Sequence, residues 1–259
     1  MTGREQTGAD SARRLPILDA LRGVAILMMV SFHFCFDLTY WQLADWDLLA
    51  DPRWIAWRNV IVALFLWLVG AGLVLGQATT AARFWRRWGQ VAGSAVLISL
   101  VSWFMFAERF IYFGVLHFIA VAQCLGRWGL GVGAGRRPGG ILVLACICLL
   151  AGNLEFAAMN PRWLNWLGLA ASKPLTEDYV PLLPWLGVVL LGMAAVLFWQ
   201  SARRQVPPIT LTDGCGQLSI KKNDGLHGLA WLGRHSLAIY LLHQPLLMGV
   251  LAFWVSLRG

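Results

Sequence analysis

The sequence predicts an all-α protein, a polytopic membrane helix bundle with about seven transmembrane helices. Of its 259 residues, 58% are hydrophobic and only 13% are charged, whereas a soluble domain carries about 25% charged residues. Several apolar runs approach the roughly 20 residues needed to cross a bilayer. The basic residues behind the net charge of +8 lie in short segments between these runs, which the positive-inside rule explains and which argues against a nucleic-acid partner.

Seven spans follow from the apolar runs and their polar or charged flanks. Tryptophan is abundant, with 15 residues, and many lie near the ends of the runs, as in the aromatic belts of membrane interfaces. The first run is too long for a signal peptide and contains charged residues, so we expect an uncleaved first helix. The predicted spans are 15–38, 58–77, 91–107, 110–127, 139–157, 180–199 and 229–256.

Charge alternates between successive connecting segments and predicts their sides of the membrane. The N-terminal tail and the second, fourth and sixth loops are rich in arginine and lysine, which places them in the cytoplasm. The first, third and fifth loops are acidic or mixed, so they lie outside. An odd number of spans then puts the N-terminus in the cytoplasm and the C-terminus outside. The basic loop residues are Arg83, Arg86, Arg87, Arg127, Arg136, Arg137, Arg203, Arg204, Lys221 and Lys222.

The domain organisation is correspondingly simple. Residues 1–14 form a cytoplasmic tail, and 15–257 form a single transmembrane domain. Segment 203–228 contains Pro207-Pro208 and Asp213-Gly214, which predicts a cytoplasmic polar loop. The five cysteines lack the spacing of a zinc or haem site, so no metal is expected.

The first span carries ionisable residues that are costly inside a bilayer and are usually kept for function. At 100° per residue, Asp19, Arg22, His33 and Asp37 share one helix face. Arg22 and His33 lie about 16 Å apart along the helix axis. This polar face therefore runs through much of the membrane.

The predicted topology places five polar residues at a similar outer depth, which predicts one site. They are His33, Asp37, His117, Asp178 and His243. His33 and Asp37 lie one turn apart, so the carboxylate can fix the tautomer of the imidazole and raise its basicity. Tyr240 shares a helix face with His243, and Trp185 follows Asp178 at the start of the sixth span. The candidate catalytic residues are His33, Asp37, His117 and His243, and the candidate substrate-binding residues are Asp178, Trp185 and Tyr240.

A second group lies on the inner side. Asp19 and Arg22 are spaced i, i+3 and can pair on one face, although the pair can equally serve only to neutralise itself and anchor the helix end. Arginine clusters bind phosphate groups well. The residues predicted to bind a polyanion such as a nucleotide phosphate are Arg22, Asp19, Arg234, His235, Arg86 and Arg87.

Several segments resemble known membrane acyltransferases. LDALRGVAILMMVSFH (18–33) resembles the arginine–ten–histidine signature of the acyltransferase-3 type. Three further segments are similar to the catalytic domain of the heparan-alpha-glucosaminide N-acetyltransferase-like family in its short bacterial form. They are YFGVLHFIAVAQ (112–123), DYVPLLPWLGVVLLGMA (178–194) and WLGRHSLAIYLLHQPLL (231–247).

The resemblance implies an acetyl-CoA-dependent N- or O-acyltransferase in the cell inner membrane. An acetyl or other short acyl group would pass from cytoplasmic acyl-CoA to an amine or hydroxyl of a sugar or glycan on the far side. By resemblance, Arg22 lies toward the CoA and His33 at the reaction centre. The chain departs from the longer animal enzymes because it has no histidine between His33 and His117. It is also short for the superfamily, so a homodimer or a partner subunit is one way to complete the cavity.

Alternatives stay open at this point. His33 can act as a general base oriented by Asp37 or form an acyl-histidine intermediate, with His117 or His243 donating to the oxyanion. The main rival function is a proton-coupled transporter or channel that uses the intramembrane Asp and His residues. A haem- or quinone-binding protein is a third reading.

Overall fold

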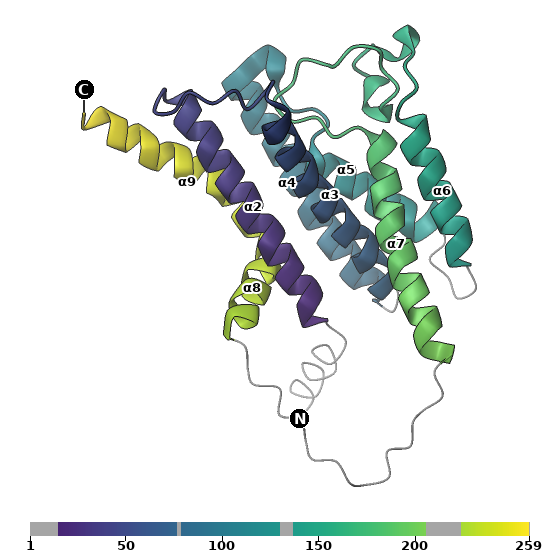
Figure 1. The fold of residues 1–259 in the computed structure, drawn as a ribbon. Helices are drawn as coiled ribbons and strands as arrows, with labels where there is room; N and C mark the ends of the chain where they lie inside the picture. Colours follow the sequence, from purple (N-terminus) through teal and green to yellow (C-terminus); the bar gives the residue numbers. More distant parts are fainter. Residues whose placement is uncertain (1–14, 77–78, 130–136, 206–223, 259) are drawn as a thin grey trace. The chain divides into compact units, whose positions relative to one another are not determined.

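The computed structural model describes residues 15–76, 79–129, 137–205 and 224–258 (Figure 1). Across these ranges the chain forms helices, turns and loops with two isolated β-bridges. The predicted tail 1–14 and most of the predicted polar loop 203–228 lie outside the described residues. The prediction of an all-α membrane helix bundle is confirmed.

Five helices are long and apolar enough to cross a membrane. The helical segments are Pro16–Tyr40 (α2), Pro52–Leu75 (α3), Ala81–Arg109, Leu182–Arg203 and Ser236–Ser256 (α9). The third contains α4 (Ala81–Phe106), and the fourth belongs to α7 (Leu182–Gln205). Two shorter apolar helical stretches, Val115–Trp128 and Pro138–Ala151 (α6), account for the remaining predicted spans. Each predicted apolar run therefore contains a helix, although two are shorter than a bilayer-crossing helix.

The predicted start of the fourth span at residue 110 is wrong. α5 begins only at Val115 and ends at Cys124, followed by a π-helical turn over Leu125–Gly129. The preceding residues pair with the chain before α7, because Phe113 forms a parallel β-bridge with Tyr179. The predicted end of the fifth span is also too late, since α6 stops at Ala151.

The last predicted span, 229–256, is divided into two helices. α8 covers Asp224–Arg234, and α9 begins at Ser236. The backbone N–H of His235 donates to the carbonyls of Trp231 and Leu232 at 3.2 and 3.1 Å, which tightens the last turn of α8. Figure 1 shows the chain changing direction between α8 and α9. Residues 224–228, the last of the predicted loop 203–228, belong to α8.

The chain divides into two compact units, which are described separately. The first comprises Met1–Ile61 and Thr212–Gly259, and the second comprises Val62–Leu211. In the first unit α2 packs against α8 and α9. A Cβ atom at Gly23 would overlap the carbonyl of Leu229, and one at Gly233 would overlap the carbonyl of Asp19. Each helix therefore uses a glycine to bring its neighbour's backbone into contact, as small residues do in membrane helix pairs.

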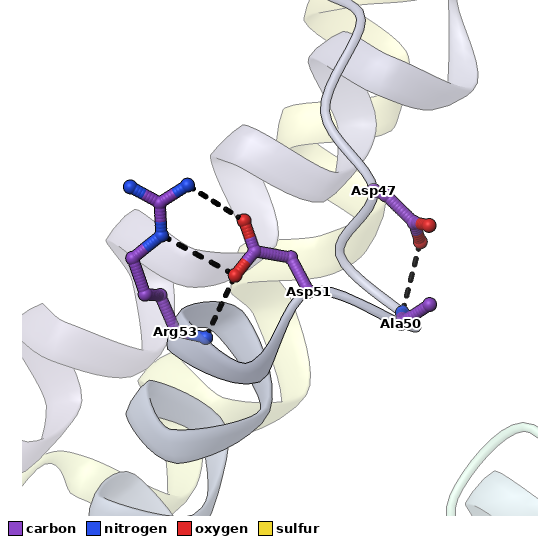
Figure 2. Close-up of polar contacts among 4 residues, drawn as sticks. All are labelled: Asp47, Ala50, Asp51 and Arg53. Atoms are coloured by element: carbon purple, nitrogen blue, oxygen red, sulfur yellow. Dashed lines mark hydrogen bonds and ion pairs between the residues drawn. The ribbon is translucent and has the colours of Figure 1, made fainter.

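The loop before α3 is held by two aspartates (Figure 2). Asp51 accepts hydrogen bonds from the backbone N–H of Arg53 at 2.8 Å and from Nη2 of the same residue at 3.0 Å. It thus caps α3, with Pro52 at the first helical position. These hydrogen bonds lower the pKa of Asp51, and the bond from the Arg53 side chain has the larger effect. Asp47 accepts from the N–H of Ala50 at 2.8 Å.

The second unit has its core between α3, α5, α6 and α7. Phe118, Leu190 and Met193 are fully buried there. α4 instead exposes apolar side chains such as Leu100 and Phe104, which is typical of a lipid-facing helix surface.

The glycine contact between α2 and α8 predicts a stability difference within one helix. We expect Gly233→Ala to destabilise the protein by about 1–3 kcal/mol, because its methyl group meets the Asp19 backbone. Gly228→Ala is the matched control, since a Cβ there meets nothing within 4 Å. Thermal unfolding of both purified variants in detergent checks this. Equal melting temperatures would contradict the packing described.

Candidate functional site

Two histidines from opposite ends of the chain meet in the first unit. His33 lies in α2 and His243 in α9. Nδ1 of His33 and Nε2 of His243 are within hydrogen-bond contact, and the two rings stack with centroids 4.8 Å apart and an interplanar angle of 15°. His243 is buried and His33 is half-buried. The structure therefore brings together two of the predicted catalytic residues.

The surroundings of His243 assign the tautomer of both rings. Its Nδ1 lies 2.8 Å from the carbonyl oxygen of Tyr240 and 3.1 Å from that of Ile239. A carbonyl only accepts, so Nδ1 of His243 must carry hydrogen, and Nε2 of the neutral ring is then an acceptor. It follows that Nδ1 of His33 donates to it.

This assignment leaves Nε2 of His33 with a lone pair. Within the described part of the chain, no hydrogen bond engages that nitrogen. General-base catalysis by histidine uses this arrangement, in which a partner holds one ring nitrogen and the other nitrogen keeps its lone pair. His243 supplies here the orientation that the sequence analysis assigned to Asp37.

The predicted pairing of Asp37 with His33 is wrong. Asp37 is fully buried, and its Oδ1 accepts a hydrogen bond of 2.6 Å from Nε2 of Gln244 in α9. The spacing of Asp37 and His33 puts them on one face of α2, but each side chain has its hydrogen-bond partner in α9. The two contacts lie side by side, since Gln244 follows His243 directly.

Three buried polar atoms near this contact lack a hydrogen-bond partner among the residues described. They are Oδ2 of Asp37, Oε1 of Gln244 and Nε1 of Trp41. A buried donor or acceptor without a partner costs about 1–3 kcal/mol. The contact between the C-terminal part of α2 and α9 therefore concentrates unsatisfied polar groups beside the histidine pair.

Aromatic rings pack on the neighbouring face of α2. Phe32 contacts His33 edge-on, with centroids 5.9 Å apart, and also lies 6.1 and 5.9 Å from Trp54 and Trp57 in α3. Trp46, from the loop fixed by Asp47 and Asp51, packs on Trp54 at 5.6 Å. This cluster shields one side of the histidine pair and holds the loop against α3.

His117 lies in the middle of a series of hydrogen bonds in the second unit. Its Nδ1 accepts from the N–H of Gly114 at 3.3 Å, so Nε2 carries the hydrogen. Nε2 donates to Oγ of Ser99 at 3.0 Å, and Ser99 donates to the carbonyl of Ile111 at 2.6 Å. Both nitrogens are engaged, which favours a structural role at the start of α5.

Asp178 caps the same helix. Its Oδ2 accepts from the N–H of Val115 at 2.9 Å, where a carboxylate also interacts favourably with the helix dipole. Gly114 leaves room for this cap, because a Cβ there would overlap that carboxylate. Tyr112 and Tyr179 donate to the side chain and the backbone of Asn165, at 2.8 and 2.6 Å.

Burial raises the pKa of Tyr112. It also raises the pKa of Tyr179 to about 12, with a further contribution from Tyr112. The remaining predicted substrate-binding residues belong to different units. Trp185 packs against the core of the second unit, while Tyr240 lies in the first unit, with its ring 6.0 Å from that of His243.

The inner predicted residues are partly brought together. Nη1 of Arg22 pairs with Oδ1 of Asp19 at 2.8 Å. Gly233 of α8 lies against the turn of α2 that contains Asp19 and Arg22. Arg234 and His235 directly follow Gly233 in the sequence. Nδ1 of His235 donates to the carbonyl of Trp231 at 2.9 Å. Arg86 and Arg87 are exposed on α4 in the second unit.

The residues that were predicted to converge on one outer site therefore form two separate groups of contacts, one within each unit. His33, Asp37 and His243 meet in the first unit, and His117 and Asp178 both bind the N-terminus of α5 in the second. A single site that joins both groups stays a prediction. The sequence did not predict a role for Gln244, although this residue follows His243 directly in segment 231–247.

The fold and these contacts define a multi-pass membrane protein with a histidine pair between two helices. The chain matches the family described as heparan-alpha-glucosaminide N-acetyltransferase, catalytic, over residues 14–245. It belongs to this family, so it is a membrane acetyltransferase by family, as the resemblance of its motifs predicted. No curated protein and no solved structure matches the chain.

The capping role of Asp178 predicts a measurable loss of stability. We expect Asp178→Ala to lower the free energy of unfolding by about 1 kcal/mol, the usual effect of removing a helix cap. Glu177→Ala is the control, because Glu177 pairs with the half-exposed Arg109 at 2.9 Å and such surface pairs contribute little. Thermal unfolding of the two variants compares them. A larger loss in Glu177→Ala would contradict the capping role.

The raised pKa of Tyr179 predicts a pH dependence. The unfolded tyrosine ionises near 10.0 and the folded one near 12, so between these values the unfolded state binds fewer protons than the folded state. Stability therefore falls as pH rises through this window. We expect Tyr179→Phe to flatten the fall, measured by unfolding at several alkaline pH values. An unchanged slope would contradict the assignment.

Proposed function

We propose that the protein transfers an acetyl or other short acyl group from cytoplasmic acyl-CoA to an amine or hydroxyl of a sugar or glycan at the extracytoplasmic side. The observation that carries the proposal is the histidine pair, in a chain that belongs to an acetyltransferase family. His33 is the catalytic base, and His243 orients it.

The reaction follows from the assigned tautomers. Nε2 of His33 removes the proton from the acceptor N–H or O–H while the acceptor attacks the thioester carbonyl. The C–S bond breaks as the new C–N or C–O bond forms, and the leaving thiolate takes the proton back from His33. His33 is positively charged between these steps, with its Nδ1–H donating to His243.

His243 also stabilises that charge. Its Nε2 accepts from the imidazolium, and its own Nδ1–H remains directed at two carbonyl oxygens of α9. Hydrogen bonds to a charged donor are about twice as strong as neutral ones. His33 thus acts as a base that is oriented by a hydrogen bond to His243.

The donor would bind on the inner side. Arg22 and Arg234 are suited to CoA phosphates, with Asp19 holding Arg22 and His235 beside Arg234; Arg86 and Arg87 of α4 are further candidates. Asp178, Trp185 and Tyr240 stay proposed acceptor contacts. The cell inner membrane is the proposed location, with the N-terminus in the cytoplasm, and a homodimer is the proposed assembly.

Substitution of the base tests this function. We expect His33→Ala to reduce acetyl transfer by about 10²–10⁴-fold, the usual contribution of a general base. His227→Ala is the control, because His227 is an exposed residue of α8. The measurement uses purified protein, radiolabelled acetyl-CoA, and glucosamine or glucose as amine and hydroxyl acceptors.

The same experiment separates direct transfer from a covalent route. In direct transfer, no label stays on the protein in the absence of acceptor. Label retained by the wild type and lost in His33→Ala would overturn the base role in favour of an acyl-histidine. Equal transfer by His33→Ala and wild type would overturn the site.

A further inference from the structure

The contact between Asp37 and Gln244 lies directly beside the histidine pair. Asp37 follows His33 by one turn of α2, and Gln244 is the next residue after His243 in α9. The carboxyl group is 0% exposed and receives the amide hydrogen bond at 2.6 Å. Two polar contacts therefore join the same two helices at adjacent positions.

Apolar packing alone holds α9 weakly in this region. Leu242 and Leu246, which flank the contact, are 58% and 63% exposed. Apolar side chains exposed to lipid give no preference for one helix register over another, whereas interhelical hydrogen bonds do. A second contact one turn along also fixes rotation, which a single hydrogen bond leaves free.

We propose that Asp37 and Gln244 are positioning residues whose hydrogen bond sets the register of α9 on α2 that brings Nε2 of His243 to Nδ1 of His33. Asp37 acts through this contact and not as a charged partner of the base. Only the kinetic part of the test rests on the proposed function.

The unpartnered oxygens distinguish positioning from a need for charge. Oδ2 of Asp37 and Oε1 of Gln244 are both acceptors without a donor. In Asp37→Asn, Oδ1 can still accept from Gln244, and an N–H replaces the second carboxylate oxygen and can supply the missing donor. A positioning pair therefore tolerates Asp37→Asn, while a reaction that needs the carboxylate does not.

The first measurement is kinetic, on the full-length protein in detergent with acetyl-CoA and glucosamine. We expect Gln244→Leu to lower kcat by about 10²-fold, the effect of a ~1 Å misplacement of a reacting group, with KM for acetyl-CoA unchanged. Asp37→Asn keeps kcat within about threefold of the wild type, because it retains the hydrogen bond to Gln244 and a change of this size is smaller than the typical effect of losing one hydrogen bond. Leu246→Ala is the matched control from the same helix.

The second measurement does not depend on activity. Diethyl pyrocarbonate acylates imidazole nitrogens that have a free lone pair, and mass spectrometry locates the product. We expect His33 to react and His243 to be protected in the wild type and in Asp37→Asn. In Gln244→Leu, modification of His243 rises because its Nε2 loses its donor.

The outcomes separate the two proposals. Absence of acetyl transfer in the wild type overturns the proposed function, while the modification pattern still decides the positioning role. Loss of activity in Asp37→Asn equal to that in Gln244→Leu overturns positioning, as does an unchanged modification pattern in Gln244→Leu. Should Gln244→Leu not fold, the double variant Asp37→Asn with Gln244→Leu takes its place, because it leaves no unpaired carboxylate.

Discussion

The hydrogen bond from Nδ1 of His243 to the backbone of α9 is the interaction on which the account of the site depends. It uses carbonyl oxygens three and four residues earlier in the same helix, so the helix itself determines where the hydrogen lies. That choice passes to His33 across the contact between the rings. The lone pair on Nε2 of His33 is the consequence, and with it the capacity to act as a base.

Close helix packing makes this contact possible. Gly23 and Gly233 allow α2 and α8 to touch backbone to backbone, and the break at His235 then redirects the chain into α9. Because α8 and α9 both pack against α2, the position of α8 influences where α9 begins and where His243 lies. Packing at Gly23 and polar contacts at His33 and Asp37 thus act on the same helix, α2.

The apolar helices could be predicted from the sequence because hydropathy is a local property. All seven runs contain helices, and the polar face of α2 contains residues that meet polar partners. The errors arose where distant segments compete. Residues 110–114 are apolar but pair with the chain at Tyr179, and Asp37 binds Gln244 rather than its neighbour His33. A pairing across 210 residues has no signature in either segment alone.

The position of the hydrogen on the His33 ring decides whether this residue can act as the base. Nitrogen-15 NMR of the histidine-labelled protein, assigned with His33→Asn and His243→Asn, reports which ring nitrogen carries hydrogen. The chain has only five histidines, which keeps the spectrum simple. We expect hydrogen on Nδ1 and a bare Nε2 for His33 at a pH where the pair is neutral. Hydrogen on Nε2 of His33 would contradict it.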